Sequence, residues 1–149
     1  MMLLRTSILL LALGASVGPA SAGSNATKCA LTDQQFATAI NTLRDWPKIH
    51  TFYKANFPPC PDDGMFAEGY SELVVRTFAT NWRNLGELRV AASQDPRFKA
   101  FVLRHIDATT NEADLRVIQS SATSQCPKGN GSLCAEIRKA SSRALSELR

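Results

Sequence analysis

Apolar side chains recur every three or four positions along most of the chain, and no segment keeps the strict alternation of a strand for more than a few residues. This spacing places apolar residues on one face of a helix. The most apolar stripe after residue 22 runs from Phe66 to Trp82, which predicts a central, buried helix there. The stripes comprise Phe36, Ala39/Ile40, Leu43; Trp46, Ile49, Phe52/Tyr53, Phe57; Phe66, Tyr70, Leu73/Val74, Thr77/Phe78, Trp82; Leu85, Leu88, Ala91, Ala92; Phe98, Phe101/Val102, His105/Ile106; Leu115, Ile118, Ala122; and Leu133, Ile137, Ala140, Ala144/Leu145, Leu148.

Polar residues and prolines predict where these helices begin and end. Thr32 with Gln35 forms a capping-box pattern, in which each residue satisfies a backbone N–H of the other. The stretch FPPCPDD, residues 57–63, ends the helix predicted for 46–56, and Asn84 with Gly86 marks a break. The other predicted caps are Asp45, Asp62 or Asp63, Asp95, Thr109 (with Glu112 as a second capping box) and Ser132. The pattern predicts an all-α fold, a single compact bundle of six to seven short helices.

The first 22 residues have the three parts of a secretory signal peptide. Arg5 precedes an apolar run over about 7–17, and Ala20-Ser21-Ala22 forms an A-x-A cleavage site. The alternative is an N-terminal membrane anchor, but the run is shorter than the roughly 20 residues that span a bilayer. We therefore predict a signal peptide at 1–22, a helical domain at 23–149, and export to the periplasm or the outside of the cell.

The four cysteines all lie in the predicted mature part. An even number of cysteines in an exported chain favours disulfides, which fits an oxidising compartment. Cys29 and Cys60 flank two helices, predicted over about 33–45 and 46–56, whose outer ends meet if the helices fold back on each other. Cys126 and Cys134 flank one short loop. Of the three possible connectivities, this geometry favours Cys29–Cys60 with Cys126–Cys134.

Charge and length narrow the possible partners. The whole chain carries a net charge of +4, and removal of the leader, whose one charged residue is Arg5, leaves +3. Basic and acidic residues are interleaved, without the basic stripe that nucleic-acid binding needs. No second apolar segment could cross a membrane. Asn25 and Asn130 begin N-glycosylation sequons, which matter only in a eukaryotic host.

Three residues are weak candidates for catalysis. Glu68 and Glu72 lie four apart and share a helix face, as paired carboxylates for acid–base chemistry could, but Arg76 continues the stripe and favours an ion pair with Glu72. His105 lies at the edge of an apolar stripe, where a satisfied core histidine competes with a catalytic role. His50 is predicted to face solvent.

Motifs for metals and cofactors are not found in the sequence. The spacing between Cys126 and Cys134 is too wide for a zinc knuckle or a C-x-x-C redox site. The chain holds no G-x-S-x-G elbow, no glycine-rich phosphate loop and no C-x-x-C-H haem motif. Trp46, Tyr70 and Trp82 could stack on a ligand, but their places within apolar stripes favour core packing. We expect no metal and no cofactor.

These features favour a protein-binding module over an enzyme. In size, predicted export, helices and cysteines the chain is similar in outline to the all-helical periplasmic immunity proteins that block peptidoglycan amidases. That likeness implies an inhibitor of another protein, with Asp62, Asp63 or Glu68 entering the partner's site. The alternatives are a small secreted hydrolase that uses Glu68, Glu72 or His105, and an envelope structural protein without enzymatic activity.

Overall fold

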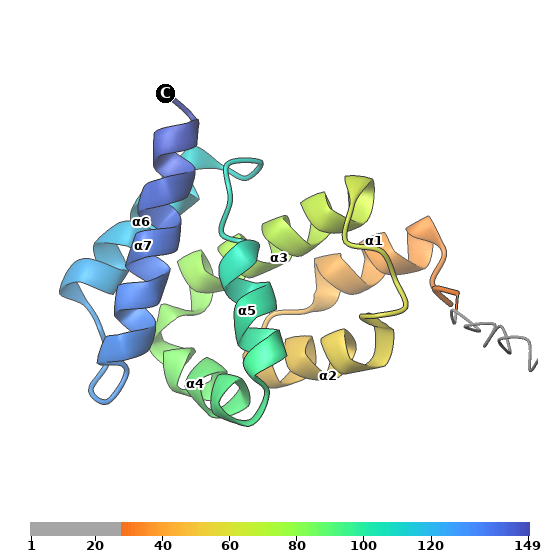
Figure 1. The fold of residues 1–149 in the computed structure, drawn as a ribbon, viewed down its shortest axis with the longest axis horizontal. Helices are drawn as coiled ribbons and strands as arrows, with labels where there is room; N and C mark the ends of the chain where they lie inside the picture. The colour runs from red at the N-terminus through yellow and green to blue at the C-terminus, as the bar shows by residue number, and fades with distance from the viewer. Residues whose placement is uncertain (1–27) are drawn as a thin grey trace, which may run out of the picture.

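The computed structural model describes residues 28–149, so the predicted signal peptide at 1–22 and the sequon at Asn25 lie outside the described residues. The described part is all-helical, which confirms the predicted fold class (Figure 1). Its helices are α1 (Asp33–Thr42), α2 (Trp46–Asn56), α3 (Gly64–Asn81), α4 (Leu85–Gln94), α5 (Pro96–Arg104), α6 (Glu112–Ser124) and α7 (Gly131–Glu147), with η1 (Trp82–Asn84), a turn of 3₁₀ helix, between α3 and α4. Among residues 28–149, no helix is both long and apolar enough to cross a bilayer.

Helix α3 runs through the middle of the bundle, as predicted from its composition (Figure 1). It contacts α1 on one side and α6 on the other, while α4 contacts both α2 and α5. The last two helices, α6 and α7, lie side by side, and α7 also contacts α5. Helices α5 and α7 contact each other at only a few positions, which leaves a groove between them.

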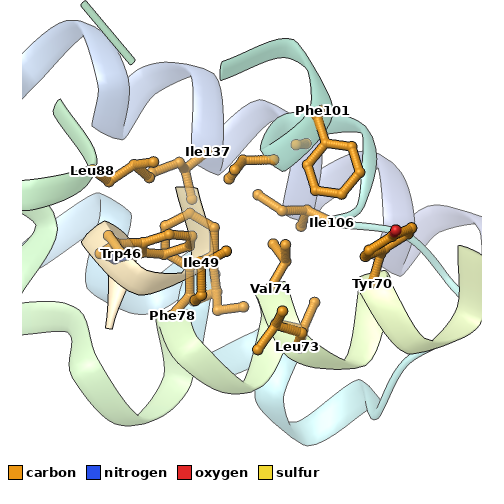
Figure 2. Close-up of a cluster of buried hydrophobic side chains, with 14 of the residues drawn as sticks. Trp46, Ile49, Tyr70, Leu73, Val74, Phe78, Leu88, Phe101, Ile106 and Ile137 are labelled. Carbon is orange, nitrogen blue, oxygen red and sulfur yellow. The ribbon is translucent and has the colours of Figure 1, made fainter. Parts of the chain in front are cut away.

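The core gathers side chains from most of the helices (Figure 2). Trp46 of α2 is fully buried, and its ring centroid lies 4.7 Å from that of Phe78 of α3. Toward the other end of α3, Tyr70 meets Phe101 of α5 edge-on at 5.0 Å. Such tilted aromatic pairs add to the free energy gained by burying their area. Trp46 and Tyr70 are therefore core residues, as predicted, and Trp82 is partly buried against the same core.

The predicted starts of three helices are confirmed by their hydrogen bonds. The Thr32 hydroxyl accepts from the N–H of Gln35, whose side chain accepts from the N–H of Thr32. Asp45 accepts from the N–H of Lys48 at the start of α2. Asp95 accepts from the N–H groups of residues 97 and 98 at the start of α5. These carboxylates and hydroxyls satisfy N–H groups that have no partner within the helix.

The predicted starts of the last two helices were wrong. The N-cap of α6 is Asn111, whose side-chain oxygen accepts from the N–H of Ala113 at 2.8 Å. Thr109 instead donates its hydroxyl to Asp107, so the proposed capping box of Thr109 with Glu112 does not form. Helix α7 begins at Gly131, with Asn130 rather than Ser132 at the N-cap position. In both cases an asparagine close to the expected residue takes the cap position.

The two disulfides are Cys29–Cys60 and Cys126–Cys134, which confirms the predicted connectivity. The first joins the segment before α1 to the loop between α2 and α3, as expected if α1 and α2 fold back on each other. The second closes the loop between α6 and α7. The first bridge therefore joins the outer ends of α1 and α2, and the second fixes the loop that connects α6 to α7.

Glycine at position 69 allows α1 to approach α3 closely. A Cβ there would lie 2.6 Å from Cε1 of Phe36, which must move to admit it. We expect Gly69→Ala to lower the free energy of unfolding by about 1–2 kcal/mol, because overpacking exceeds the roughly 1 kcal/mol gained in helix propensity.

Gly86 in α4 is the matched control, since a Cβ there meets nothing within 4 Å. Gly86→Ala is expected to stabilise the protein by up to about 1 kcal/mol. Urea denaturation of both variants measures the difference. Equal stabilisation by the two changes would contradict the close packing of α1 on α3.

Candidate functional site

A buried polar cluster joins α3 to the segment that follows α5. His105, 3% exposed, lies at the C-terminal end of α5, and Ser71, 1% exposed, lies on α3. The Ser71 hydroxyl oxygen lies 3.0 Å from Nδ1 of His105 and 2.6 Å from Oδ2 of Asp107. On the other side of the ring, Nε2 of His105 lies 3.0 Å from Oδ1 of Asp62, which also pairs with Arg104.

The hydrogen bonds of this cluster run in one direction. Ser71 has one proton and three possible acceptors, the carbonyl of Ala67 at 2.9 Å, Nδ1 of His105 at 3.0 Å and the carboxylate of Asp107 at 2.6 Å. The bond to the charged carboxylate is the shortest and the strongest of the three. With its proton donated to Asp107, the Ser71 oxygen accepts from the Nδ1–H of His105. Asp107 accepts two further bonds, from the N–H and the hydroxyl of Thr109.

The pKa directions agree with this arrangement. Burial lowers the pKa of His105 below 6.5, against the opposing attraction of Asp62, so the neutral ring is favoured. Burial alone would raise the pKa of Asp107, but the hydrogen bonds from Ser71 and Thr109 outweigh it and hold the pKa below 3.8. The cluster is therefore a neutral histidine that donates from Nδ1 through a serine to an ionised aspartate, while its unprotonated Nε2 and the facing Oδ1 of Asp62 have no hydrogen-bond partner among the described residues.

In connectivity, the series Asp62–His105–Ser71 is that of a serine nucleophile with its base. Two observations favour a structural role instead. The Ser71 hydroxyl is buried on α3, where a substrate carbonyl has no access to it. Its proton also goes to Asp107 rather than to the histidine, so the histidine does not activate the oxygen. The cluster ties α3, α5 and the loop after α5 together.

The two glutamate candidates lie apart from this cluster. Glu68 and Glu72 are both exposed on α3. Glu72 pairs with Arg76 at 3.3 Å, as the spacing predicted. Arg76 also donates to the backbone carbonyl of Ile40 at 2.7 Å, which ties α3 to α1. This geometry is that of a solvated, ion-paired helix face.

One predicted position was wrong. His50 was expected to face solvent, but it is half-buried, with Nε2 3.0 Å from Oδ2 of Asp95 and its ring 4.5 Å from that of Phe98. It ties α2 to the start of α5. The predicted N-cap of α3 was Asp62 or Asp63, and Asp63 holds that position, although its side chain makes no capping hydrogen bond. Asp62 instead pairs with Arg104, and its Oδ1 lies 3.0 Å from Nε2 of the buried His105.

The sequon at Asn130 is closed by the fold. Asn130 is 4% exposed, and its amide nitrogen donates to the carbonyls of Pro127 and Lys128. The folded protein therefore does not present this nitrogen for glycosylation. The residue instead holds the turn between Cys126 and Cys134 in shape.

An open groove of about 590 Å³ lies between α5 and α7. Its floor is apolar, formed by Ala100 and Leu103 of α5 and Ala140 of α7. Arg104, Lys139 and Arg143 line its rims, and Glu136, which also lines it, pairs with Lys99 at 2.9 Å. A groove of this size falls in the range of ligand sites.

Sequence reasoning did not identify Ser71, Asp107 or this groove. Ser71 left one signal, since it is a polar residue inside the most apolar helix and such residues need a buried partner. Asp107 follows the end of α5, and no spacing pattern in the sequence connects it to Ser71. The groove depends on how α7 lies against α5, which no local pattern specifies. Within residues 28–149, no group of three or more His, Cys, Asp or Glu side chains is placed to hold a metal ion.

The lowered pKa of His105 predicts how stability varies with pH. The unfolded chain protonates this histidine as the pH falls through 6.5, whereas the folded chain does so only at a lower pH. Below about pH 6.5, folding therefore loses stability progressively until the folded-state pKa is reached. Carboxylates whose pKa is lowered in the folded state, such as Asp107, reduce the stability further only below about pH 3.8.

His105→Asn is the matched variant, because an asparagine amide can replace the Nδ1–H donor without titrating. We expect the variant to keep most of its stability near pH 7.5 and to lose less than the wild type between about pH 7.5 and about pH 5. Urea denaturation at the two pH values measures the difference. Equal losses in the two proteins would show that His105 does not titrate as described.

Comparison with known proteins does not assign a function to the polar cluster or to the groove. No family model matches the chain, and no curated protein or solved structure matches it either.

Proposed function

We propose that this chain is exported and works as a binding module for another protein, in the manner of an inhibitor or an immunity-type protein. The proposal of export rests on the signal-peptide pattern of residues 1–22, and the two disulfides are compatible with it. The periplasm or the outside of the cell is the proposed compartment. The surface proposed to bind the partner is the groove between α5 and α7.

The groove is the observation that carries the proposal. It combines an apolar floor with charged rims, which is the composition of surfaces that receive a segment of another protein. Leu103 is the largest side chain of the floor and is only half-buried in the free protein. A partner that covers Leu103 would gain the free energy of removing its remaining apolar surface from water.

The acidic residues suggested by the likeness to immunity proteins are less favoured than the groove as the surface that binds a partner. Asp62 is partly buried, where it already pairs with Arg104 and faces the buried His105 ring. Asp63 and Glu68 are exposed near the start of α3, and neither lines the groove between α5 and α7. The hydrolase alternative is disfavoured because the serine and histidine of the polar cluster are buried.

Affinity capture with matched variants tests the proposal. Residues 23–149 with both bridges intact would be immobilised and exposed to periplasmic and secreted fractions of the host and its neighbours. We expect one stoichiometric partner that the wild type and Val117→Asp retain and that Leu103→Asp loses by at least about tenfold, since a buried charge at the centre of an interface is costly. Val117 is the control because it is 45% exposed on α6, away from the groove.

Circular dichroism of all three proteins would confirm that they are folded equally. A partner retained equally by both variants would exclude the groove as the binding surface. No partner at micromolar bait would contradict tight inhibition and favour an envelope structural protein. Hydrolytic activity lost in His105→Asn or Glu72→Gln would favour the enzyme alternative.

A further inference from the structure

Resting on the proposed function, we further propose that the groove between α5 and α7 receives an acidic, amphipathic helical segment of the partner protein. Charge on the rims, the shape of the floor and the spacing of the basic residues each contribute to this assignment. The partner is thereby defined by its chemistry, a helix with carboxylates along the side of an apolar stripe that faces α7.

The α7 rim holds positive charge that the described residues do not fully neutralise. Glu136 is balanced by Lys99, and Arg104 by Asp62. Lys139 has no carboxylate partner within residues 28–149, and Arg143 has only Glu147, at 3.9 Å and more than half-exposed. The α7 rim therefore presents two cations to whatever enters the groove, and carboxylates are the groups that complement them.

The floor sets the shape of the segment. Ala100 and Ala140 are small, so a backbone can approach α5 and α7 closely between them. Leu103 lies between the two rims and offers contact to one or two apolar side chains. A groove that lies between two helices and is lined partly by apolar residues suits the helix-in-groove mode of recognition.

The spacing of the cations fits a helix in particular. Lys139 and Arg143 are four residues apart on α7, which separates them by about 6 Å along its axis. Glutamates four apart on a facing helix have the same separation, so each could meet one cation. An apolar residue between them in the helical pattern would then lie over Leu103.

Peptide selection tests this assignment with a defined probe. A phage-displayed library of random 16-residue peptides would be selected on residues 23–149 and depleted on the double variant Lys139→Glu/Arg143→Glu. We expect the surviving peptides to be enriched in pairs of Asp or Glu four apart, next to apolar residues. A synthetic survivor should bind the double variant at least about tenfold more weakly, and added salt should weaken its binding to the wild type.

The control is Arg83→Glu/Arg138→Glu, which makes the same charge change at exposed positions outside the groove. It should bind the synthetic peptide within about twofold of the wild type. Peptides without acidic enrichment, or the absence of any peptide that survives depletion, would overturn the proposal. A dimer of this chain that the Lys139→Glu/Arg143→Glu variant abolishes would assign the groove to a second copy and would also overturn it.

The capture experiment distinguishes failure of the acidic-segment proposal from failure of the proposed function. If the captured partner is lost by Leu103→Asp but retained by Lys139→Glu/Arg143→Glu, the groove binds a protein without needing an acidic segment. If neither variant affects capture, the binding surface lies elsewhere and both proposals fail.

Discussion

Replacing Cys29 and Cys60 together by serine is expected to lower the free energy of unfolding by about 3–4 kcal/mol. The bridge closes a loop with a sequence separation of 31 residues, and without it the unfolded chain gains the conformational freedom of that whole loop. The folded state also loses a tie between the segment before α1 and the loop that leads to Asp62. A loss of this size is a large share of the stability of a typical single domain.

The second bridge provides the internal comparison. Cys126 and Cys134 are only 8 residues apart, so replacing them by serine should cost less, about 2–3 kcal/mol. Urea denaturation of the two double variants, without reductant, measures both losses. A greater loss for the Cys126/Cys134 pair would contradict the assignment of the Cys29–Cys60 bridge as the main constraint on the unfolded chain.

Replacing Asp107 by alanine is expected to destabilise the protein by about 3 kcal/mol. The change removes an acceptor of three hydrogen bonds, one from Ser71 and two from Thr109. Ser71 is buried, so water cannot replace the lost bond. Its hydroxyl is left with the weaker, uncharged acceptor at the carbonyl of Ala67. Bonds to a charged group are worth more than those between neutral groups.

Glu68→Ala is the matched control for this change, because it removes an exposed carboxylate from the same region without a buried partner. It should alter the free energy of unfolding by less than about 0.5 kcal/mol. Differential scanning calorimetry of the two variants tests the comparison. Equal stability of Asp107→Ala and the wild type would show that the buried cluster does not hold α3 to the loop after α5.

The fold was predictable from the sequence because its determinants are local. The apolar stripe from Phe66 to Trp82 placed α3 at the centre, and Thr32, Asp45 and Asp95 marked helix starts through bonds to nearby N–H groups. The cysteine pairing followed from helix lengths and one loop. Each of these inferences depends on residues close in sequence or on simple helix geometry.

The candidate sites were less predictable because they depend on contacts between distant segments. Ser71 and Asp107 are 36 residues apart, and His50 and Asp95 are 45 apart. No periodicity connects such pairs. His105 was expected at the edge of the core, which its burial confirms, but the identity of its partners required the packing of α3 on the segment after α5. The groove similarly depends on the distance between α5 and α7.

The central claim is that the groove between α5 and α7 binds a protein, and crosslinking at the groove tests it most directly. A photoreactive phenylalanine analogue would be placed at Leu103 or, as a control, at Val117 in the full chain expressed in its host. We expect irradiation to give one adduct of defined mass at position 103 and none at position 117. An adduct at position 117 alone, or none at either position, would contradict the claim.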